Sequence, residues 1–473
     1  MLDRWQSTTE ANGARLPDYG ALAAAIRRLI RDGRLALGVR LPAERELAEA
    51  LSVSRTTVTA AYRELRTSGH LSSRRGAGSW TALPTGQRLA ISGAWVPTQE
   101  PGIIDLGNAA FSAPPQLTAA AAEAVADLDR YTGTNGYHPA GLSELRQAVA
   151  GTFAARGLPT HADQILITNG VQHAFDLVLR LLGAPGQSVL VESPTYPNVL
   201  AALRAHRVRV STDNLDPVSG WDPDLLLGAI RSGRPAMAYL IPEFQNPTGH
   251  LMPVSLREQL VAVAHRAGTD LIVDESFVEL PLDEEPPAPV ASFDRHARVL
   301  TVGGMTKPYW GGLRVGWIRA ATAIIARLVA LRVPIDMAGP VLDQLVAVRL
   351  LERAGEVIPA RKVQLLAQRD ALAAALREHL PRWSWTQPAG GVCLWAELDA
   401  PVSTALAHAA LAHGVRVAPG PRFGVDGTLE RFLRLPYTLP AEDLQAAVRR
   451  LSAAATTVNE AQPPEWTTPT LVA

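Results

Sequence analysis

Lysine is scarce in this chain, and one lysine occupies a position suited to covalent chemistry. Among 45 lysine and arginine residues, only Lys307 and Lys362 are lysines. Arginine supplies a positive charge but cannot form a Schiff base, whereas a lysine amine can. Lys307 follows the apolar run 299–302 and two glycines, which places it in a loop at the end of a strand. Lys362 lies in an arginine- and glutamine-rich helical stretch, where we expect it to be solvated, so Lys307 is the candidate nucleophile.

Asp274 is the second candidate for chemistry. It ends a very apolar run, residues 271–273, so a strand is expected to deliver its carboxylate to a buried position. Burying a carboxylate is costly unless a cationic group lies opposite it. A pyridinium nitrogen would serve as that partner.

A third strand-like run ends in residues that could hold an anion. The run 165–168 leads into Gly170, Val171 and Gln172 at the start of a helix. Unpaired N–H groups and the helix dipole suit phosphate there, and glycine allows a ligand to approach the backbone closely. The alternative is an ordinary turn, because a glycine often precedes a helix for that reason alone.

Two more strands end in polar residues at the same predicted rim. Tyr196 follows the strand 188–191 and could stack on a flat ring. Asn246 follows the strand 237–241, in a loop fixed by prolines, and its amide could bond a ligand oxygen. The alternatives are a core tyrosine and a plain Asn-Pro turn.

The elements that must position these residues follow a repeating pattern. From about residue 103 onward, short apolar strands alternate with longer helical patterns, which predicts an α/β domain built on a mostly parallel sheet. Ligands bind such sheets at the carboxyl ends of the strands, where all the candidates fall.

A basic module precedes this domain. Residues 1–82 contain 13 arginines and 8 acidic residues, although the net charge of the whole chain is zero. Helical patterns at 18–32, from Pro42 and from Ser54 are followed by two strand-like pieces around a glycine turn that carries Arg74 and Arg75. The order is typical of a winged helix-turn-helix, and the charge suits DNA. A solvated arginine-rich face, or a three-helix module for protein contacts, is the alternative.

Residues 41–71, LPAERELAEALSVSRTTVTAAYRELRTSGHL, resemble the winged helix-turn-helix of the GntR superfamily. The resemblance implies that the exposed first turn of the third helix and the wing contact double-stranded DNA. The residues it nominates for DNA binding are Arg45, Ser54, Arg55, Thr56, Thr57, Arg75 and Gly76.

Residues 103–455 resemble the fold type I aminotransferases, and the combination with the N-terminal module resembles MocR-type regulators. The resemblance implies that pyridoxal 5'-phosphate forms an internal aldimine with Lys307, that Asp274 pairs with its pyridine nitrogen, that Asn246 bonds its ring hydroxyl and that Tyr196 stacks on the ring. It further implies roles for residues that hold the phosphate and an effector carboxylate. These are Gly170, Val171, Gln172, Thr306 and Arg314 for the cofactor, and Arg434 for the carboxylate.

The chain departs from the family pattern at two positions. The family usually has a tyrosine three residues after the aspartate, where this chain has Phe277, and often a serine three residues before the lysine, where it has Gly304. Thr306 is a partial substitute for that serine. Both losses should weaken turnover more than binding.

The resemblance also implies a domain organisation. We expect a winged helix-turn-helix over 1–82, a linker over 83–102, the aminotransferase-like domain over 103–460 with a small C-terminal α+β subdomain and helices on both faces of its sheet, and a tail over 461–473. We expect a homodimer, in which Tyr131 or Tyr137 reaches the partner's phosphate, and no metal.

Composition narrows the cellular setting. One cysteine, Cys393, excludes an internal disulfide, and neither an early secretion signal nor a run of about 18 apolar residues is present. We therefore expect a cytoplasmic protein without a membrane span.

The residues are compatible with three functions. The favoured one is a transcription regulator that senses an amino compound, or the cofactor itself, through aldimine chemistry at Lys307 and alters its DNA affinity. The alternative is an active aminotransferase that carries a DNA-binding module, with Lys307 moving the proton of the substrate's α-carbon. A repressor whose large domain only dimerises would leave Lys307, Asp274 and Arg434 without a purpose.

Overall fold

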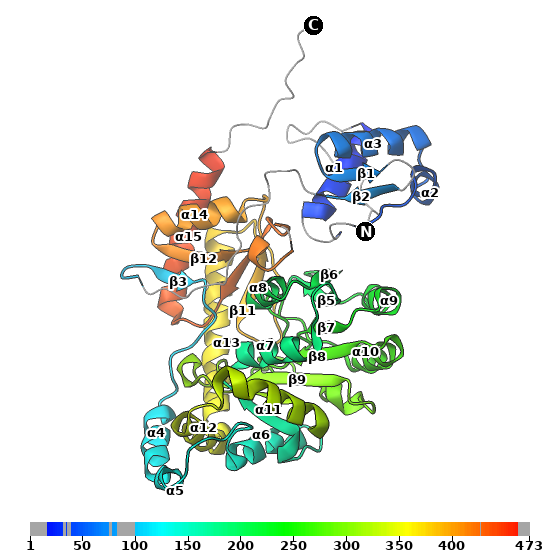
Figure 1. Ribbon diagram of the computed structural model, residues 1–473. Helices are drawn as coiled ribbons and strands as arrows, with labels where there is room; N and C mark the ends of the chain where they lie inside the picture. The colour runs from blue at the N-terminus through cyan, green and yellow to red at the C-terminus, as the bar shows by residue number, and fades with distance from the viewer. Residues whose placement is uncertain are drawn as a thin grey trace.

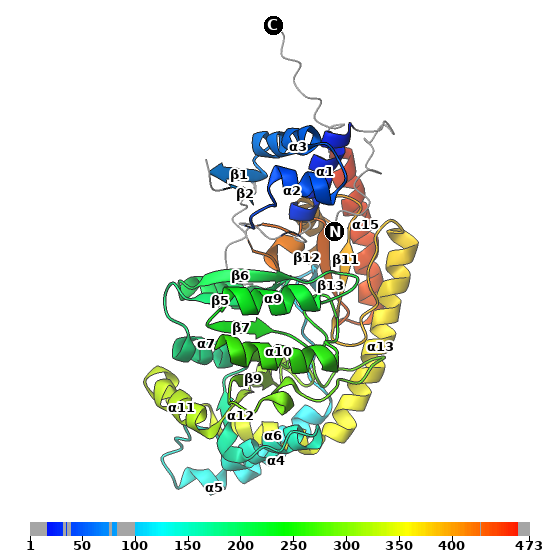
Figure 2. The same ribbon diagram turned by 90° about the vertical axis from the view of Figure 1, so that its right-hand side faces the viewer.

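The computed structural model describes residues 17–31, 35, 39–74, 78–82, 100–425 and 427–461. These residues form an N-terminal module, a large α/β part and a smaller α+β part (Figures 1 and 2). The predicted linker residues 83–99, the wing residues Arg75 and Gly76, and the tail residues 462–473 lie outside the described residues.

The N-terminal module has the predicted order of three helices and two antiparallel strands. Leu22, Ile26, Val58 and Leu65 form its buried core. The second helix begins two residues after Pro42, because the Ala43 N–H donates to the Glu46 side chain at 2.9 Å and so ends the extended segment there. The elements are α1 (Asp18–Arg31), α2 (Glu44–Ala50), α3 (Arg55–Thr67), β1 (Leu71–Arg74) and β2 (Gly78–Thr81).

The large part is built on a mixed sheet in the order β4-β10-β9-β8-β7-β5-β6, in which only β10 runs antiparallel to its neighbours. The predicted mostly parallel sheet is therefore confirmed. The strands are β4 (Ile165–Thr168), β5 (Ser188–Ser193), β6 (Arg209–Asn214), β7 (Met237–Leu240), β8 (Asp270–Asp274), β9 (Val299–Gly304) and β10 (Gly316–Arg319).

Helices cover both faces of this sheet, because alternate residues of each central strand enter opposite cores. In β8, Ile272 packs into the core on the side of α7, whereas Leu271 and Val273 pack into the core on the side of α10. Figure 2 shows α9 and α10 together on one face. The helices are α4 (Gln116–Asp127), α5 (Asp129–Thr132), α6 (Ser143–Ala155), α7 (Val171–Leu182), α8 (Pro197–Ala205), α9 (Pro223–Gly233), α10 (Val254–Ala267), α11 (Thr322–Asp336), α12 (Val341–Glu352) and α13 (Ala354–His379).

The smaller part contains a second sheet in the order β11-β13-β12-β3. Its edge strand β3 comes from the start of the large domain rather than from its end, and it pairs in parallel with β12 through Ile104 and Val415. The long helix α13 joins the two parts (Figure 1). The remaining elements are β3 (Ile104–Leu106), β11 (Cys393–Glu397), α14 (Ser403–Ala412), β12 (Val415–Pro419), β13 (Phe432–Pro436) and α15 (Ala441–Ala461).

The described residues contain neither a membrane-spanning helix nor a metal-binding cluster. None of their helices combines the length and the apolar composition needed to cross a bilayer. Within the same ranges, no three histidine, cysteine or acidic side chains gather closely enough to hold a metal ion.

Candidate functional site

A small cavity of about 100 Å³ lies at the carboxyl ends of the central strands. It opens beside a larger one of about 1040 Å³, and the two share a wall made of Tyr196, Asn246, Thr306, Lys307 and Arg314. Val171, Gln172, Asp274 and Ser276 also line the small cavity. The structure therefore brings together every residue nominated for the cofactor except Gly170, which lies just behind this wall.

Asp274 ends β8 with its carboxylate buried in the small cavity. The Tyr239 hydroxyl donates to its Oδ2 at 2.5 Å, and both the hydroxyl and the N–H of Ser276 donate to its Oδ1, at 2.5 and 2.9 Å. Burial raises the pKa of Asp274, and these hydrogen bonds oppose the rise because they favour the charged form. The result is an oriented carboxylate that can face a cationic ring nitrogen.

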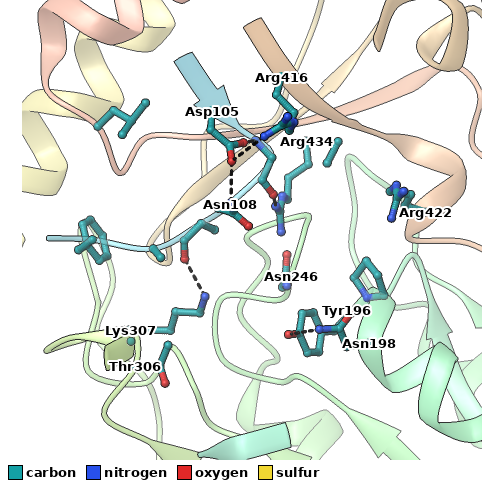
Figure 3. A pocket seen from close by; sticks show the side chains of 18 of the residues that line it. Asp105, Asn108, Tyr196, Asn198, Asn246, Thr306, Lys307, Arg416, Arg422 and Arg434 are labelled. Atoms are coloured by element: carbon teal, nitrogen blue, oxygen red, sulfur yellow. Dashed lines mark hydrogen bonds and ion pairs between the residues drawn. The ribbon is translucent and has the colours of Figure 1, made fainter. Parts of the chain in front are cut away.

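Lys307 extends from the loop after β9 and is half-buried. Its Nζ donates to the carbonyl oxygen of Ala109 at 2.6 Å (Figure 3). Burial, together with the positive charge of Arg434, lowers the pKa of the amine from 10.5 to about 8, while the charge of Asp274 opposes this change. Near neutral pH the uncharged fraction of the amine is therefore minor but far larger than that of an ordinary lysine, and the uncharged form is the nucleophile.

The phosphate-sized end of the cavity is formed by the start of α7 and by Arg314. Gly170 precedes α7 and has a φ of +86°. Because glycine has no side chain that could cap the helix, the first N–H groups of this 12-residue helix are open to an anion. Arg314 donates to the Asn169 carbonyl at 3.0 Å. A Cβ on Gly170 would lie 2.8 Å from the Arg314 Nη2 atom and would crowd this cradle. Such a donor set fits a phosphate ester.

Tyr196 and Asn246 lie on the remaining walls. Asn198 donates to the Tyr196 hydroxyl oxygen at 3.0 Å, which fixes the ring, and burial raises the pKa of that hydroxyl. Asn246 is 6% exposed, and its amide oxygen accepts a long contact from the Cys393 thiol, at 4.0 Å. Its polar group is thus available to a ligand oxygen. With the anion cradle and Asp274, these walls fit the pyridoxal phosphate expected from the sequence.

Arg434, on β13, lies at the boundary with the large cavity. Its guanidinium is stacked over Phe423, 4.9 Å from the ring centre, and donates through Nη2 to the Gly107 carbonyl. Its Nε is buried without a hydrogen-bond partner among the described residues, and burial lowers the pKa of the guanidinium. A buried arginine with an unused donor can receive a carboxylate.

The two departures from the family pattern have structural counterparts. Phe277 is buried and lines the small cavity with an apolar edge. Gly304 cannot be replaced by serine without movement, because a Cβ there would lie 2.9 Å from the Val315 carbonyl oxygen and 3.0 Å from Val171. Thr306 does line both cavities.

Sequence reasoning missed three residues at this site. Ser276 and Tyr239 hold Asp274, and Arg361 donates to the carbonyls of Ser112 and Tyr309, both at 3.1 Å, beside the Lys307 loop. The position of Ser276, two residues after a strand-end aspartate, was an available signal for an Asx-type turn. Tyr239 lies within a buried strand and Arg361 within a long helix, where neither pattern indicates a site.

The tyrosines expected to reach a partner subunit occupy the α5 region. Tyr131 donates to Glu144 at 3.0 Å and packs edge-on against His138, whereas Tyr137 is 61% exposed. Tyr137 is therefore the better placed of the two for a contact outside its own chain. Lys362 forms an exposed ion pair with Glu285 at 3.2 Å.

The described residues nominated for DNA binding lie on α2, which carries Arg45, and at the start of α3, which carries the other four. Arg45, Arg55 and Thr56 are exposed, and Thr57 is partly so. The Ser54 hydroxyl accepts the Thr57 N–H at 3.1 Å, so Ser54 caps α3 and positions its first turn.

Comparison with known proteins matches two family models to this chain. The model for aminotransferase class I and II covers residues 102–451, and the model for bacterial regulatory proteins of the gntR family covers residues 18–80. YdfD of Bacillus subtilis, which is named an uncharacterized HTH-type transcriptional regulator, is 27% identical over 92% of this chain and 96% of its own length.

Two aminotransferases match about three quarters of this chain over nearly all of their own length. The 2-aminoadipate transaminase of Thermus thermophilus is 32% identical over 76% of this chain and 91% of its own length. The crystal structure of LysN, an alpha-aminoadipate aminotransferase from Thermus thermophilus, superimposes with a TM-score of 0.70 at 30% identity over 76% of this chain and 94% of that chain. The resemblances inferred from the sequence are thus confirmed at the level of both families.

Proposed function

This chain belongs to the aminotransferase class I and II family, with a gntR-family region ahead of that domain, and on this premise we propose its function. It is a DNA-binding transcription regulator whose aminotransferase-like domain binds pyridoxal phosphate at Lys307 and senses a small amino compound or the cofactor itself. The observation that carries the proposal is the convergence of the Lys307 amine, the Asp274 carboxylate and the α7 anion cradle on one cavity. The full-length similarity to proteins named HTH-type regulators supports the regulatory half.

Different residues of the chain would bind the phosphate, the ring nitrogen, the ring hydroxyl and the ring face of the cofactor. Val171, Gln172 and Arg314 would bind its phosphate, Asp274 its ring nitrogen and Asn246 its ring hydroxyl, with Tyr196 against the ring face. When bound, pyridoxal phosphate supplies an aldehyde for an amine to attack and a ring that withdraws electrons from that carbon.

Lys307 provides the attacking amine. Its lowered pKa keeps part of it neutral near physiological pH, and Asp274, held by Ser276 and Tyr239, orients the ring that it meets. Arg434 would hold the carboxylate of an amino compound at the boundary of the large cavity, since its buried Nε lacks a partner among the described residues. This arrangement suits an amino acid as effector.

The N-terminal module would bind DNA. The first turn of α3 carries exposed Arg55 and Thr56 on a rigid, capped helix, the part of a recognition helix that reaches base edges. A homodimer would present two such helices to two half-sites. Ligand binding shifts DNA affinity only if the liganded and unliganded states of the homodimer hold its two DNA-binding modules in different positions.

The second candidate is an active aminotransferase, which the similarity to transaminases favours. Phe277 and Gly304 count against efficient turnover, because neither supplies the hydroxyl that the family has there.

One experiment tests the regulator against the enzyme. The full chain selects duplexes from a random DNA pool, and the affinity for the enriched duplex is measured with and without pyridoxal phosphate. We expect sequence enrichment and a ligand-dependent affinity in the wild type, and no ligand dependence in Lys307→Ala. The absence of an enriched duplex, or steady multiple-turnover transamination with unchanged DNA affinity, would overturn the proposal.

A further inference from the structure

A single backbone segment accepts hydrogen bonds from both Lys307 and Arg434. Residues 105–112, which we call the strap, run from the end of β3 in the small sheet to the region before α4 in the large part. Arg434 donates to the strap carbonyl of Gly107, and Lys307 donates to the strap carbonyl of Ala109 at 2.6 Å. In Figure 3 the Lys307 side chain points at the main chain of this segment, which also carries Asp105 and Asn108.

The two ends of the strap are held by groups that no ligand needs. At one end, β3 pairs with β12 from Val415 to Val417. At the other, the buried Arg361 donates to the Ser112 carbonyl and also to the Tyr309 carbonyl, which ties the strap to the loop of Lys307. The Arg361 guanidinium lies 4.4 Å above the centre of the Phe111 ring. The ends are therefore fixed. In the middle, the Gly107 N–H and the Asn108 amide donate to the Asp105 carboxylate, both at 2.7 Å, while Lys307 and Arg434 join the carbonyls of Ala109 and Gly107 to the large part and to β13.

We propose that the strap reports ligand occupancy: capture of an aldehyde by Lys307 removes the hydrogen-bond donor of the Ala109 carbonyl and frees the middle of the strap. This inference rests on the function proposed above and adds how ligand binding at the site changes the structure around it. In the covalent step, the Lys307 nitrogen forms a double bond to the aldehyde carbon. The aldehyde oxygen leaves as water with two hydrogens of the neutral amine, so the nitrogen can no longer donate to Ala109.

An effector carboxylate acts on the second anchor. It would occupy the guanidinium of Arg434 and compete with the Gly107 carbonyl for its Nη2 hydrogens. Occupancy at both positions weakens both anchors of the middle of the strap. The strap continues from β3, which is the first described strand after the predicted linker to the DNA-binding module.

Hydrogen-exchange mass spectrometry of the full chain tests this inference. Peptides covering residues 100–115 are followed with and without pyridoxal phosphate, and the visible absorbance of the same samples reports covalent capture. Loss of a charged hydrogen bond should speed exchange of the strap amides about tenfold when the cofactor is added. Lys362→Ala, which changes the exposed lysine, should behave as the wild type.

Two substitutions at Lys307 separate the lost donor from general damage. Lys307→Ala removes the donor, so its strap should exchange at the fast rate without cofactor. Lys307→Arg keeps N–H donors but cannot capture an aldehyde, so its strap should exchange slowly with and without cofactor. If the wild type gains visible absorbance while hydrogen exchange of its strap stays unchanged or becomes slower, the strap inference alone is overturned. Slow strap exchange in Lys307→Ala would have the same consequence. A colourless wild type would overturn the proposed function and this inference together.

Discussion

The Lys307 amine lies over the face of Phe277, with 5.8 Å between its Nζ and the centre of the ring. A cation in this position is stabilised by the ring, but the ring offers no hydrogen bond to the groups that react with the amine. Phe277 is 4% exposed and lines the small cavity together with Lys307, so a tyrosine at this position would bring a hydroxyl to this part of the site.

Phe277→Tyr should raise the rate of transamination by about tenfold, because a positioned hydroxyl that assists proton transfer contributes at least that much. The rate is measured with a panel of amino donors under multiple-turnover conditions. The double variant Phe277→Tyr with Lys307→Ala should lose the gain entirely. A tyrosine variant no faster than wild type would mean that the missing hydroxyl does not limit turnover.

Capture of pyridoxal phosphate should follow the titration of the Lys307 amine. Only the neutral amine attacks, so the capture rate should fall about tenfold per pH unit below a pKa of about 8 and level off above it. Stopped-flow absorbance between pH 6 and 10 would record this profile. Arg434→Gln removes a positive charge that depresses this pKa, so its midpoint should move to higher pH. A rate that climbs without a plateau to pH 10 would contradict the burial argument.

Gly170→Ala should weaken binding of pyridoxal phosphate at least tenfold while changing the binding of unphosphorylated pyridoxal little. The new Cβ would lie 2.8 Å from the Arg314 Nη2 atom, at a φ of +86° that disfavours alanine. Gly151→Ala on α6 is the matched control, since a Cβ there meets nothing within 4 Å. Equal losses for both ligands in the Gly170 variant would place the phosphate elsewhere.

Arg55→Ala should lower the affinity for the selected duplex by about tenfold and reduce the salt dependence of binding by about one phosphate contact. Arg55 is exposed at the first position of α3. Arg382→Ala, which removes an exposed arginine paired with Asp399 in the aminotransferase-like part, should leave both quantities unchanged. Equal behaviour of the two variants would argue against α3 as the recognition helix.

Much of this architecture could be predicted from residue patterns, because each strand of the large sheet is a short apolar run that ends in a distinctive residue. Asp274 and Lys307 lie where the ends of β8 and β9 were expected. The helix-to-wing order of the N-terminal module followed from the apolar stripes of its helices in the same way.

The supporting contacts could not be predicted, because they join residues far apart in the sequence. Nothing local indicates that the three-residue strand β3 pairs with β12, about 300 residues later, or that the Ala109 carbonyl lies against Lys307. Tyr239 has the pattern of a core aromatic, and only the fold reveals that its hydroxyl reaches Asp274.

Chemical trapping at Lys307 tests the central claim most directly. The full chain is mixed with pyridoxal phosphate, reduced with borohydride, digested and analysed by mass spectrometry. We predict one pyridoxyl group on the peptide that contains Lys307 and none on the peptide that contains Lys362, the other lysine of the chain. An unlabelled Lys307, or equal labelling of both lysines, would contradict the account.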